Sequence, residues 1–571
     1  MLKAVTTPSE MSVWDARSRR FGIPEAVLME NAARTVFEEL KARSALAGRI
    51  IWIFAGKGNN GGDGYCLARI LGDEGAVPVL LSSLSESQYS AKSTKEIIGK
   101  MPEQENAVLR TIGACPEKTE GRPEKASNDR ETEGIGAAAL NECLAVRCGI
   151  PVICLGELDD DALSLRISQA VREFGAPDIV VDALLGTGTK GSLRSNEMRL
   201  VMAINRFKAF VCSVDIPSGL DGMTGGAQPV AVQADMTVTF QAAKPGLLLP
   251  KARPYVGELI IRSIGIPGGI RSADPSSFCM VSGDFSQAAK TPAHKGEAGS
   301  VMIFGGSPSY KGALRLAIMG AFSGGAGLVY ASGSGEVLQG LADTLPESVT
   351  VELSGDWGAD RKVLAAKMIK LRSAVLGPGQ GSRKDFVVSV LRLRSEVRPD
   401  LPFVLDADAL NVLAEDKALL ALVGKGDVLT PHPAEAARLL GISTPEVEQD
   451  RQAALRALQD LAPCVWVLKG IGTLAGRAGG TCCICPVDAP LLATAGSGDV
   501  LAGLIGALLA RGVFMPSEAG VPLVSASEAA AFIGVRIHAQ AGLDLERAFP
   551  EKRGARASDI ASAIARMDAA Q

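Results

Sequence analysis

Short runs of apolar residues alternate with helical patterns along the first half of the chain. The segment 24–46 has apolar residues at helical spacing, and the run 49–55 that follows it is apolar almost throughout. Such continuous runs are typical of strands in a parallel sheet, because helices bury both faces of that sheet. Later runs of the same character lie at 77–81, 150–155, 178–183 and 210–214. The alternation predicts a doubly wound α/β unit.

The second half of the chain repeats this alternation. Its apolar runs lead into polar or glycine-rich loops, and they lie at 300–304, 328–330, 374–376, 402–405, 428–429 and 465–468. A further apolar run, 500–510, has the length of a buried helix. We therefore predict two α/β domains, at 1–275 and 276–571, with their connection at about 274–292.

The segment 115–147 interrupts the first half. Proline, glutamate, lysine, serine, asparagine and arginine dominate its first part, 115–133. A stretch of this composition cannot bury enough apolar surface to offset the entropy lost when it becomes ordered. We therefore predict a disordered insertion rather than a structural unit.

Composition and charge argue against several classes of protein. The 571 residues carry a net charge of −4, which leaves no basic footprint for nucleic acid. The sequence has no run of 18 apolar residues to span a membrane, and its first eight residues lack the apolar core of a signal peptide. Eleven scattered cysteines and three histidines favour reduced thiols over a zinc site. We expect a cytoplasmic protein with no nucleic-acid or membrane partner.

The loop after the first predicted strand, 56–65, formally contains GxGxxG between a strand and a helix, which is the dinucleotide fingerprint. That fingerprint also requires an acid at the end of the second strand, whereas the first acid here is Glu86. The loop instead carries Asn59, Asn60 and Asp63, which are more polar side chains than a phosphate cradle needs. Ordinary hydride-transfer chemistry is therefore weakly supported.

Three acids follow predicted strand ends in the first half: Asp63, Asp182 and Asp215. One such acid alone is best explained as a turn cap. Three at the same sheet edge, together with Asn60 and Ser218, favour a site, because ligands bind beyond the carboxyl ends of parallel strands. These oxygen groups could hold a hard cation and a polyhydroxylated ligand.

In the second half, the loop 494–499 (TAGSGD) precedes the apolar helix. Its small residues leave backbone N–H groups open to an anion, and the helix N-terminus adds a positive dipole end. Asp499 beside such donors indicates phosphoryl transfer, in which the acid orients or deprotonates a hydroxyl; the alternative is a simple helix cap. His432 and Lys469 are candidate ligand contacts, while Asp406 and Asp408 are interpreted as turn acids outside the catalytic set.

The first half resembles the NAD(P)H-hydrate epimerase family over most of residues 5–270, through the segments 58–64, 182–188, 214–219 and 244–246. The resemblance implies a Rossmann-like three-layer fold that interconverts the R and S epimers of hydrated NADH and NADPH. It implies that Asp215 transfers the proton, and that a potassium ion is bound by Asn60, Asp182 and Ser218. The substrate contacts that it implies are Asn59, Asn60, Gly61, Gly62, Asp63, Gly186, Thr187, Gly188, Thr189, Lys190, Gly191, Ser192 and Asp215.

The second half resembles the ADP-dependent NAD(P)H-hydrate dehydratase family, which has a ribokinase-like α/β fold. The resemblance covers about 290–565 and rests on the segments 294–296, 324–328, 377–379, 430–433, 469–473 and 495–499. It implies that Asp499 is catalytic, that ADP phosphorylates the hydrate hydroxyl with Mg²⁺ present, and that phosphate is then eliminated. Substrate contacts are implied for Ala326, Gly379, His432 and Asp499. Nucleotide contacts are implied for Lys469, Gly470, Ile471, Gly472, Thr473 and Gly498.

The family's usual Asn-Pro-Gly turn before this last loop is replaced here by 489–491 (APL). Together the two resemblances indicate a bifunctional, homo-oligomeric repair enzyme for NADHX and NADPHX, with K⁺ in the first domain and Mg²⁺ and ADP in the second. One alternative is a ribokinase-like kinase for a small alcohol, with a nucleotide-binding regulatory module in front. Another is an NAD-dependent dehydrogenase.

Overall fold

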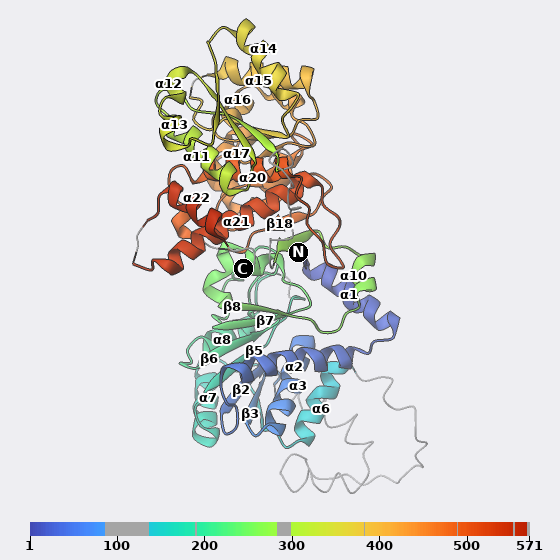
Figure 1. Cartoon of the computed structure of the whole chain (residues 1–571). Coiled ribbons are helices and arrows are strands. Elements are labelled where there is room, and N and C mark those ends of the chain that lie inside the picture. Colours follow the sequence, from blue (N-terminus) through green and yellow to red (C-terminus); the bar gives the residue numbers. More distant parts are fainter. Residues whose placement is uncertain are drawn as a thin grey trace, which may run out of the picture. The chain divides into compact units, whose positions relative to one another are not determined.

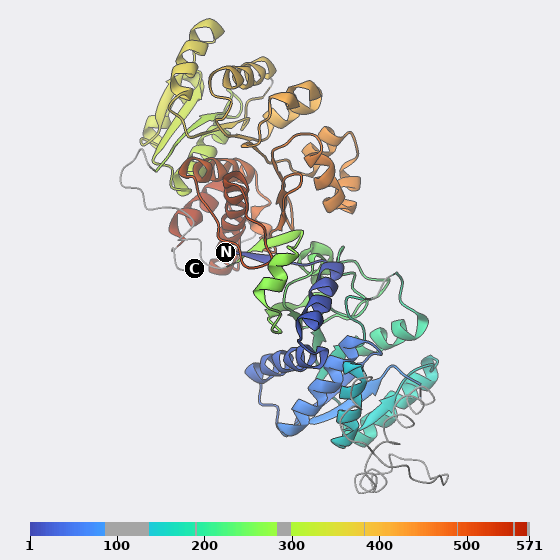
Figure 2. The same ribbon diagram turned by 90° about the vertical axis from the view of Figure 1, so that its right-hand side faces the viewer.

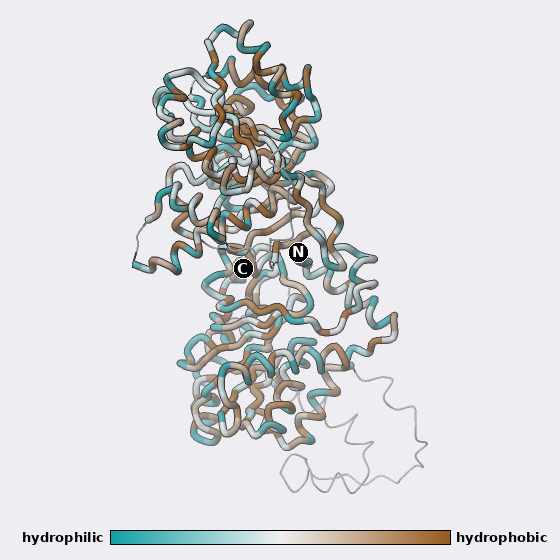
Figure 3. The backbone as a smooth tube through the Cα atoms, in the orientation of Figure 1, coloured by the Kyte–Doolittle hydropathy of each residue, from teal (hydrophilic) through white to brown (hydrophobic). Residues whose placement is uncertain are grey.

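The computed structural model describes residues 1–85, 136–188, 191–282, 298–381, 383–487, 489–551 and 554–567. The chain forms two compact units, each with its own sheet (Figure 1). One unit is Thr6–Asp274, and the other combines Met1–Val5 with Pro275–Gln571. Hydrophobic residues lie along the strands of each unit and on the helices that pack against them (Figure 3). No helix in the described ranges is long and apolar enough to cross a membrane.

The sheet of the unit Thr6–Asp274 has seven described strands in the order β4-β3-β2-β5-β6-β7-β8, and their pairings are parallel. The order runs outward in both directions from β2 and β5, as in a Rossmann-like sheet, so the switch point for ligand binding lies between these two strands. The strands are β2 (Ile50–Ala55), β3 (Val77–Ser82), β4 (Val152–Cys154), β5 (Ile179–Ala183), β6 (Phe210–Val214), β7 (Met236–Phe240) and β8 (Glu258–Arg262).

Helices cover both faces of this sheet, as the unbroken apolar character of its strands predicts (Figures 1 and 2). Trp52 of β2 points to one face, where it meets the ring of Phe207 at 5.4 Å between centroids. Ile53, the next residue, points to the other face and lies beside Gly64. The helices are α1 (Pro8–Phe21), α2 (Glu25–Arg43), α3 (Asn59–Asp73), α6 (Ala137–Arg147), α7 (Asp160–Phe174), α8 (Ser195–Ile204), α9 (Arg253–Val256) and α10 (Gly268–Ala273), with short 3₁₀ turns at Pro245–Leu248 and Pro250–Ala252.

The predicted disordered insertion at 115–147 is wrong in its last part, because α6 occupies Ala137–Arg147. This helix packs on α3, and its small residues permit close approach: a Cβ on Gly62 would lie 2.8 Å from the Cα of Ala138. Asn141 is buried and donates to the Ala137 carbonyl at 3.1 Å. The polar composition belongs to 115–133, and the alanine-rich segment after it buries a helical face. The part of the insertion at 115–135 lies outside the described residues.

The second unit contains an eleven-stranded sheet, counted over the described residues, in the order β1-β9-β18-β17-β16-β15-β14-β13-β10-β11-β12. Its centre, from β16 to β12, is parallel, and the flanking strands include antiparallel pairs. The strands are β1 (Leu2–Val5), β9 (Phe278–Val281), β10 (Ser300–Phe304), β11 (Leu328–Gly333), β12 (Val349–Glu352), β13 (Ser373–Leu376), β14 (Phe403–Leu405), β15 (Val428–Leu429), β16 (Val465–Leu468), β17 (Leu474–Gly476) and β18 (Cys482–Ile484).

The central helix of this unit is α20 (Ser497–Arg511), which confirms the helix predicted from the apolar run. Every residue from Val500 to Ala510 is buried, because α20 packs against the sheet and against neighbouring helices. The other helices are α11 (Lys311–Ser323), α12 (Gly335–Leu338), α13 (Leu341–Thr344), α14 (Trp357–Met368), α15 (Lys384–Val397), α16 (Asp408–Glu415), α17 (Pro433–Leu440), α18 (Thr444–Gln449), α19 (Arg451–Gln459), α21 (Ala526–Ala548) and α22 (Ala557–Arg566), with 3₁₀ turns at Lys417–Leu422 and Pro490–Leu492.

The first five residues belong to this second unit, whereas the predicted domain 1–275 assigned them to the first. They form β1, which pairs antiparallel with β9. Leu2 and Val5 are fully buried there, and the Leu2 N–H donates to the Pro516 carbonyl at 2.8 Å. A four-residue strand carries too little periodicity to be assigned from sequence, and its partner is more than 270 residues away in the chain.

Replacing Leu2 by alanine should destabilise the second unit by about 2–4 kcal/mol, because the substitution leaves a cavity at a fully buried site. Lys3→Ala is the matched control, since Lys3 is the exposed residue of the same strand. The measurement is the thermal unfolding of the full-length chain by calorimetry. Equal melting of Leu2→Ala and wild type would contradict the role given to β1.

Candidate active sites

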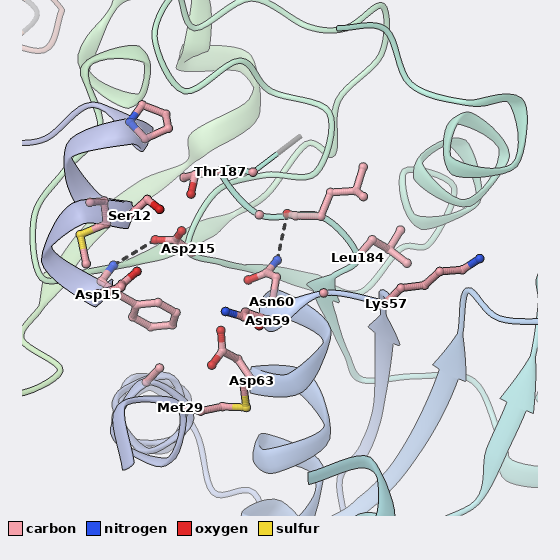
Figure 4. A pocket seen from close by; sticks show the side chains of 18 of the residues that line it. Ser12, Asp15, Met29, Lys57, Asn59, Asn60, Asp63, Leu184, Thr187 and Asp215 are labelled. Carbon is pink, nitrogen blue, oxygen red and sulfur yellow. Dashed lines mark hydrogen bonds between the residues drawn. The ribbon is translucent and has the colours of Figure 1, made fainter. Parts of the chain in front are cut away.

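A cavity of about 930 Å³ lies at the carboxyl ends of the strands in the unit Thr6–Asp274 (Figure 4). Its walls come from α1, from the loops after β2, β5 and β6, and from the segment after β7. The predicted site residues that line it are Asn59, Asn60, Asp63, Gly186, Thr187, Gly188, Ser192 and Asp215. Of the remaining predicted substrate contacts, Gly61 and Gly62 lie in the first turn of α3 and Gly191 in the loop before Ser192, while Thr189 and Lys190 lie outside the described residues.

Asp215 follows the end of β6 with a φ of 64°, which is uncommon for a residue other than glycine. Its Oδ1 accepts hydrogen bonds from the Thr239 hydroxyl at 3.1 Å and the Phe240 N–H at 3.3 Å. The same oxygen pairs with Nζ of Lys244, a lysine that is only 1% exposed. The buried ammonium requires a negative partner, so the Asp215 carboxylate is held in one orientation at the cavity wall.

Asp63 differs from Asp215, because no hydrogen bond or ion pair joins its carboxyl to another described residue. Burial raises the pKa of Asp63 well above its ordinary value, and the charges of Asp215 and Asp15 raise it further. Asp63 and Asp215 therefore differ in their surroundings: Asp63 is a buried acid with a raised pKa, whereas Asp215 is ion-paired with Lys244. Acid–base catalysis uses such differences between neighbouring acids.

The three predicted potassium ligands gather around the segment after β5. The Asn60 amide donates to the Leu185 carbonyl at 2.9 Å, and the Leu185 N–H donates to the Ser218 hydroxyl at 2.9 Å. Asn60 Oδ1 is buried and has no hydrogen-bond partner among the described residues. Asp182 is fully buried and accepts from the Ser218 hydroxyl at 2.5 Å, the Ser218 N–H at 2.8 Å and the Ser213 hydroxyl at 2.8 Å.

In the second unit, the predicted site residues after β15, β16 and before α20 also converge. Lys469 Nζ lies 2.7 Å from Asp406 Oδ1 and 4.0 Å from Glu435 Oε2. A Cβ on Gly498 would lie 3.3 Å from Lys469 Nζ, which places the first turn of α20 beside this ammonium. Burial raises the pKa of Asp499 to about 7, and the Asp406 charge adds to the shift while Lys469 opposes it.

From the sequence, Asp406 and Asp408 are interpreted as turn acids. The structure shows that this interpretation is wrong for Asp406. Asp406 is 1% exposed and provides the ion-pair partner of Lys469, so it belongs to the site. Asp408 is not a local turn acid either, since its Oδ2 accepts from the N–H of the distant Gly381 at 2.7 Å and its charge contributes to the raised pKa of Asp499. In the sequence, Asp406 and Lys469 each follow a predicted strand. Their closeness could not be predicted, because it depends on the order of β14 and β16 in the sheet.

His432 has a structural role, and its contact with a ligand stays a prediction. It caps α17, because its Nδ1 accepts from the Ala434 N–H at 3.1 Å. Its imidazole is also partly exposed at the edge that carries Lys469. Burial lowers the pKa of His432, and the positive charges of Lys469 and Arg438 lower it further. The imidazole is therefore neutral at pH 7.

The loop after β16 contains the predicted nucleotide contacts. Thr473 donates to the Gly470 carbonyl at 2.7 Å, and Ile471 is 53% exposed. Arg451 fixes the start of the loop by donating to the carbonyls of Leu468 and Lys469, each at 3.0 Å. Gly472 completes this tight turn with a φ of 66°.

Ala326 does not lie with the other predicted substrate contacts. It precedes β11, so it is at the amino end of the parallel strands, next to Gly325, whose Cβ would touch Arg511. Arg511 ends α20, about 18 Å along the helix axis from Asp499. Gly379, in contrast, lies beside Ala313 at the carboxyl edge, where a Cβ on Gly379 would be 2.7 Å from that of Ala313. The structure therefore places Gly379, but not Ala326, at the edge that carries the other predicted substrate contacts.

Both units match proteins that are already known. A family model described as NAD(P)H-hydrate dehydratase matches residues 301–566, and one described as YjeF-related protein N-terminus matches 25–116 and 129–246. The bifunctional NAD(P)H-hydrate repair enzyme of Coxiella burnetii is 33% identical over 545 residues, covering 94% of this chain and 94% of that protein. The chain belongs to the bifunctional NAD(P)H-hydrate repair enzyme family.

Other members of this repair-enzyme family match over similar lengths. The bifunctional NAD(P)H-hydrate repair enzyme of Moorella thermoacetica is 32% identical, and the match covers 97% of this chain and 94% of that protein. Among solved structures, a ribokinase-like superfamily protein from Enterococcus faecalis is 22% identical with a TM-score of 0.42, covering 50% of this chain and 93% of that chain. The family models pass over residues 117–128, which lie outside the described residues.

Gly498→Ala tests whether an anion is held between Lys469 and the start of α20. The added methyl group would occupy that space, so the affinity for ADP should fall by on the order of tenfold while the unfolding temperature stays unchanged. Isothermal titration calorimetry with ADP and Mg²⁺ measures the effect.

Gly496→Ala provides the contrast. Gly496 has a φ of 86° and its Cβ would lie 2.3 Å from Leu316 Cδ1, so this substitution should lower stability by about 1 kcal/mol or more. ADP affinity at the wild-type level in Gly498→Ala would show that the anion binds elsewhere.

Proposed function

We propose that this chain repairs hydrated NADH and NADPH with two active sites. The unit Thr6–Asp274 interconverts the R and S epimers of NADHX and NADPHX. The second unit dehydrates the S epimer at the expense of ADP. The observation that supports this division is that each unit has an acid paired with a lysine at the carboxyl edge of its own parallel sheet: Asp215 with Lys244, and Asp406 with Lys469.

The R and S epimers differ at a ring carbon that bears both a hydroxyl group and the ring nitrogen. Their interconversion requires removal of the proton of that hydroxyl group. Asp215 is suited to this task, because its ion pair with Lys244 and its backbone conformation fix its direction. A carboxylate within reach of the hydroxyl can take its proton as a general base. Asn59 and Asn60 supply amide groups for the polar parts of the nucleotide.

Dehydration needs the hydroxyl to become a leaving group. Asp499 removes the hydroxyl proton, the oxygen attacks the terminal phosphorus of ADP, and AMP leaves. The neighbouring ring carbon then loses a proton to water, its C–H electron pair forms the ring double bond, and the C–O bond breaks to release inorganic phosphate, which restores the dihydronicotinamide. Lys469 and the N-terminal N–H groups of α20 would stabilise the charge on the phosphoryl oxygens, and the closeness of Gly498 to Lys469 Nζ supports this role. Mg²⁺, when bound with the nucleotide, neutralises further phosphate charge.

The residues expected to hold potassium fit the ion unequally. Asn60 Oδ1 fits well, since it is a buried oxygen without a hydrogen-bond partner among the described residues, and K⁺ would satisfy it. Both oxygens of Asp182 already accept hydrogen bonds from Ser218, so direct ligation would replace one of them. ADP as the co-substrate, the homo-oligomeric state and the cytoplasmic location stay predictions.

The alternative of a kinase with a regulatory N-terminal module lacks support in the first unit. A module that only senses a nucleotide has no need for an unpaired buried acid such as Asp63 beside a lysine-bound carboxylate. The direct test of the repair function is spectroscopic. Hydrated NADH is incubated with the protein, Mg²⁺ and ADP or ATP, and the dihydronicotinamide absorbance is followed. The dehydratase proposal fails if neither nucleotide restores the absorbance.

Substitution of one acid in each unit should separate the two activities. Asp499→Ala should lower dehydration by about 10²–10⁴-fold and leave epimer exchange unchanged, and Asp215→Ala should do the reverse. Each variant is the control for the other, because the two acids lie in different units. Epimer exchange is followed by chromatography of the R and S forms, with the spontaneous rate subtracted. Exchange at the wild-type rate in Asp215→Ala would refute the epimerase assignment.

The Asp499 base should be sensitive to its neighbour Asp406. The Asp406 charge contributes to the raised pKa of Asp499, so Asp406→Asn should lower the pKa of Asp499 below about 7. Because the base works when deprotonated, kcat/KM for dehydration should rise through a pH near 7 in the wild type and through a lower pH in the variant. If the acid side of the kcat/KM profile lies at the same pH in Asp406→Asn as in the wild type, Asp499 is not the group that titrates.

A further inference from the structure

Helix α1 forms one wall of the cavity in the unit Thr6–Asp274. This helix precedes the segment that the family model matches, which begins at residue 25. From this helix Met11, Ser12, Asp15 and Arg19 reach the cavity. Figure 4 shows the Asp15 carboxyl group and that of Asp215 in the same space. In the part of the chain that the structure describes, no hydrogen bond or ion pair holds the Asp15 carboxyl. The group is therefore available to a ligand.

The electrostatic surroundings of Asp15 differ from those of an ordinary surface acid. Burial raises the pKa of Asp15 to about 6, with Lys244 opposing the shift and Asp215 adding to it. Near neutral pH both of its protonation states are populated, which suits a group that donates and accepts protons in turn. The charged and titratable groups that act on it or share its cavity wall are Lys244, Asp215, Arg19, Glu25 and Asp63.

We propose that Asp15 is the second proton-transfer group of the epimerase site and works together with Asp215. This inference rests on the epimerase activity proposed above. Both acids lie close enough to Lys244 to interact with its charge, but they come from different elements, α1 and the loop after β6. In the hydrated nicotinamide ring, the hydroxyl oxygen and the ring nitrogen are bonded to the same carbon. One acid can therefore exchange a proton with the oxygen while the other exchanges a proton with the nitrogen.

The chemical step balances without any further reactant. Asp215 takes the hydroxyl proton, the carbon–oxygen bond becomes a carbonyl, and the carbon–nitrogen bond breaks with its electron pair going to nitrogen. Asp15 in its acid form gives that nitrogen a proton. Rotation about the adjacent carbon–carbon bond presents the other face of the aldehyde. Ring closure then returns one proton to Asp15 and the other to the new hydroxyl group.

Asp15→Asn in the full-length chain tests this role, with Asp161→Asn as the matched control at an exposed site of α7 outside the cavity. Epimer exchange is measured from pH 5 to 9. Asp15→Asn should reduce kcat/KM by about 10²-fold or more at pH 5–6, where Asp15 of the wild type is protonated. The difference from the wild type should shrink as the pH rises above about 6. Asp15→Glu should restore part of the rate and of the pH dependence.

Two results would overturn the proposal. A uniform loss at every pH would show that Asp15 acts only structurally, and a wild-type profile in Asp15→Asn would show that it takes no part. The S-form dehydration rate and the thermal unfolding of the same variant establish that the protein is folded. Failure of the proposed function is distinguishable, because in that case the wild type itself would not accelerate epimer exchange.

Discussion

A lysine ammonium buried at the carboxyl edge of a parallel sheet must be neutralised by a carboxylate, and this constraint orders the candidate site of each unit. Lys244 is 1% exposed and pairs with Asp215, and Lys469 is 17% exposed and pairs with Asp406. Removing one partner of such a pair leaves an uncompensated buried charge, which costs about 3–5 kcal/mol. Each pair therefore fixes the position of one acid in its site.

Other acids in the two sites form no ion pair with a lysine among the described residues. The pKa values of Asp15, Asp63 and Asp499 are all raised, first by burial and then by neighbouring carboxylates. Each site thus holds a lysine-paired acid and at least one acid whose pKa lies near neutral, about 6 for Asp15 and about 7 for Asp499. Acids of these two kinds are suited to proton transfer to and from a hydroxyl group.

The two units reach this arrangement by the same architectural route. In each sheet the functional side chains stand on different strands, and the parallel direction of those strands brings their ends to one edge. β2, β5 and β6 supply the loops of the first site, and β14, β15 and β16 supply those of the second. The N-terminus of a buried helix, α3 or α20, lies at each edge and adds backbone donors.

The sequence alone determined the alternation of strands and helices and the loops that hold most of the site, such as 58–63 and 494–499. These features depend on local hydrophobic runs and on small or polar residues next to them in the chain. Tertiary structure decided the rest, because these features depend on pairing between distant segments. Residues 1–5 become a strand only through β9, α6 is ordered by packing on α3, and Asp15 reaches the cavity from a helix with no motif. The strand order likewise placed Asp406 beside Lys469 and Ala326 at the opposite sheet edge, since the direction of a parallel strand determines which of its ends meets the ligand.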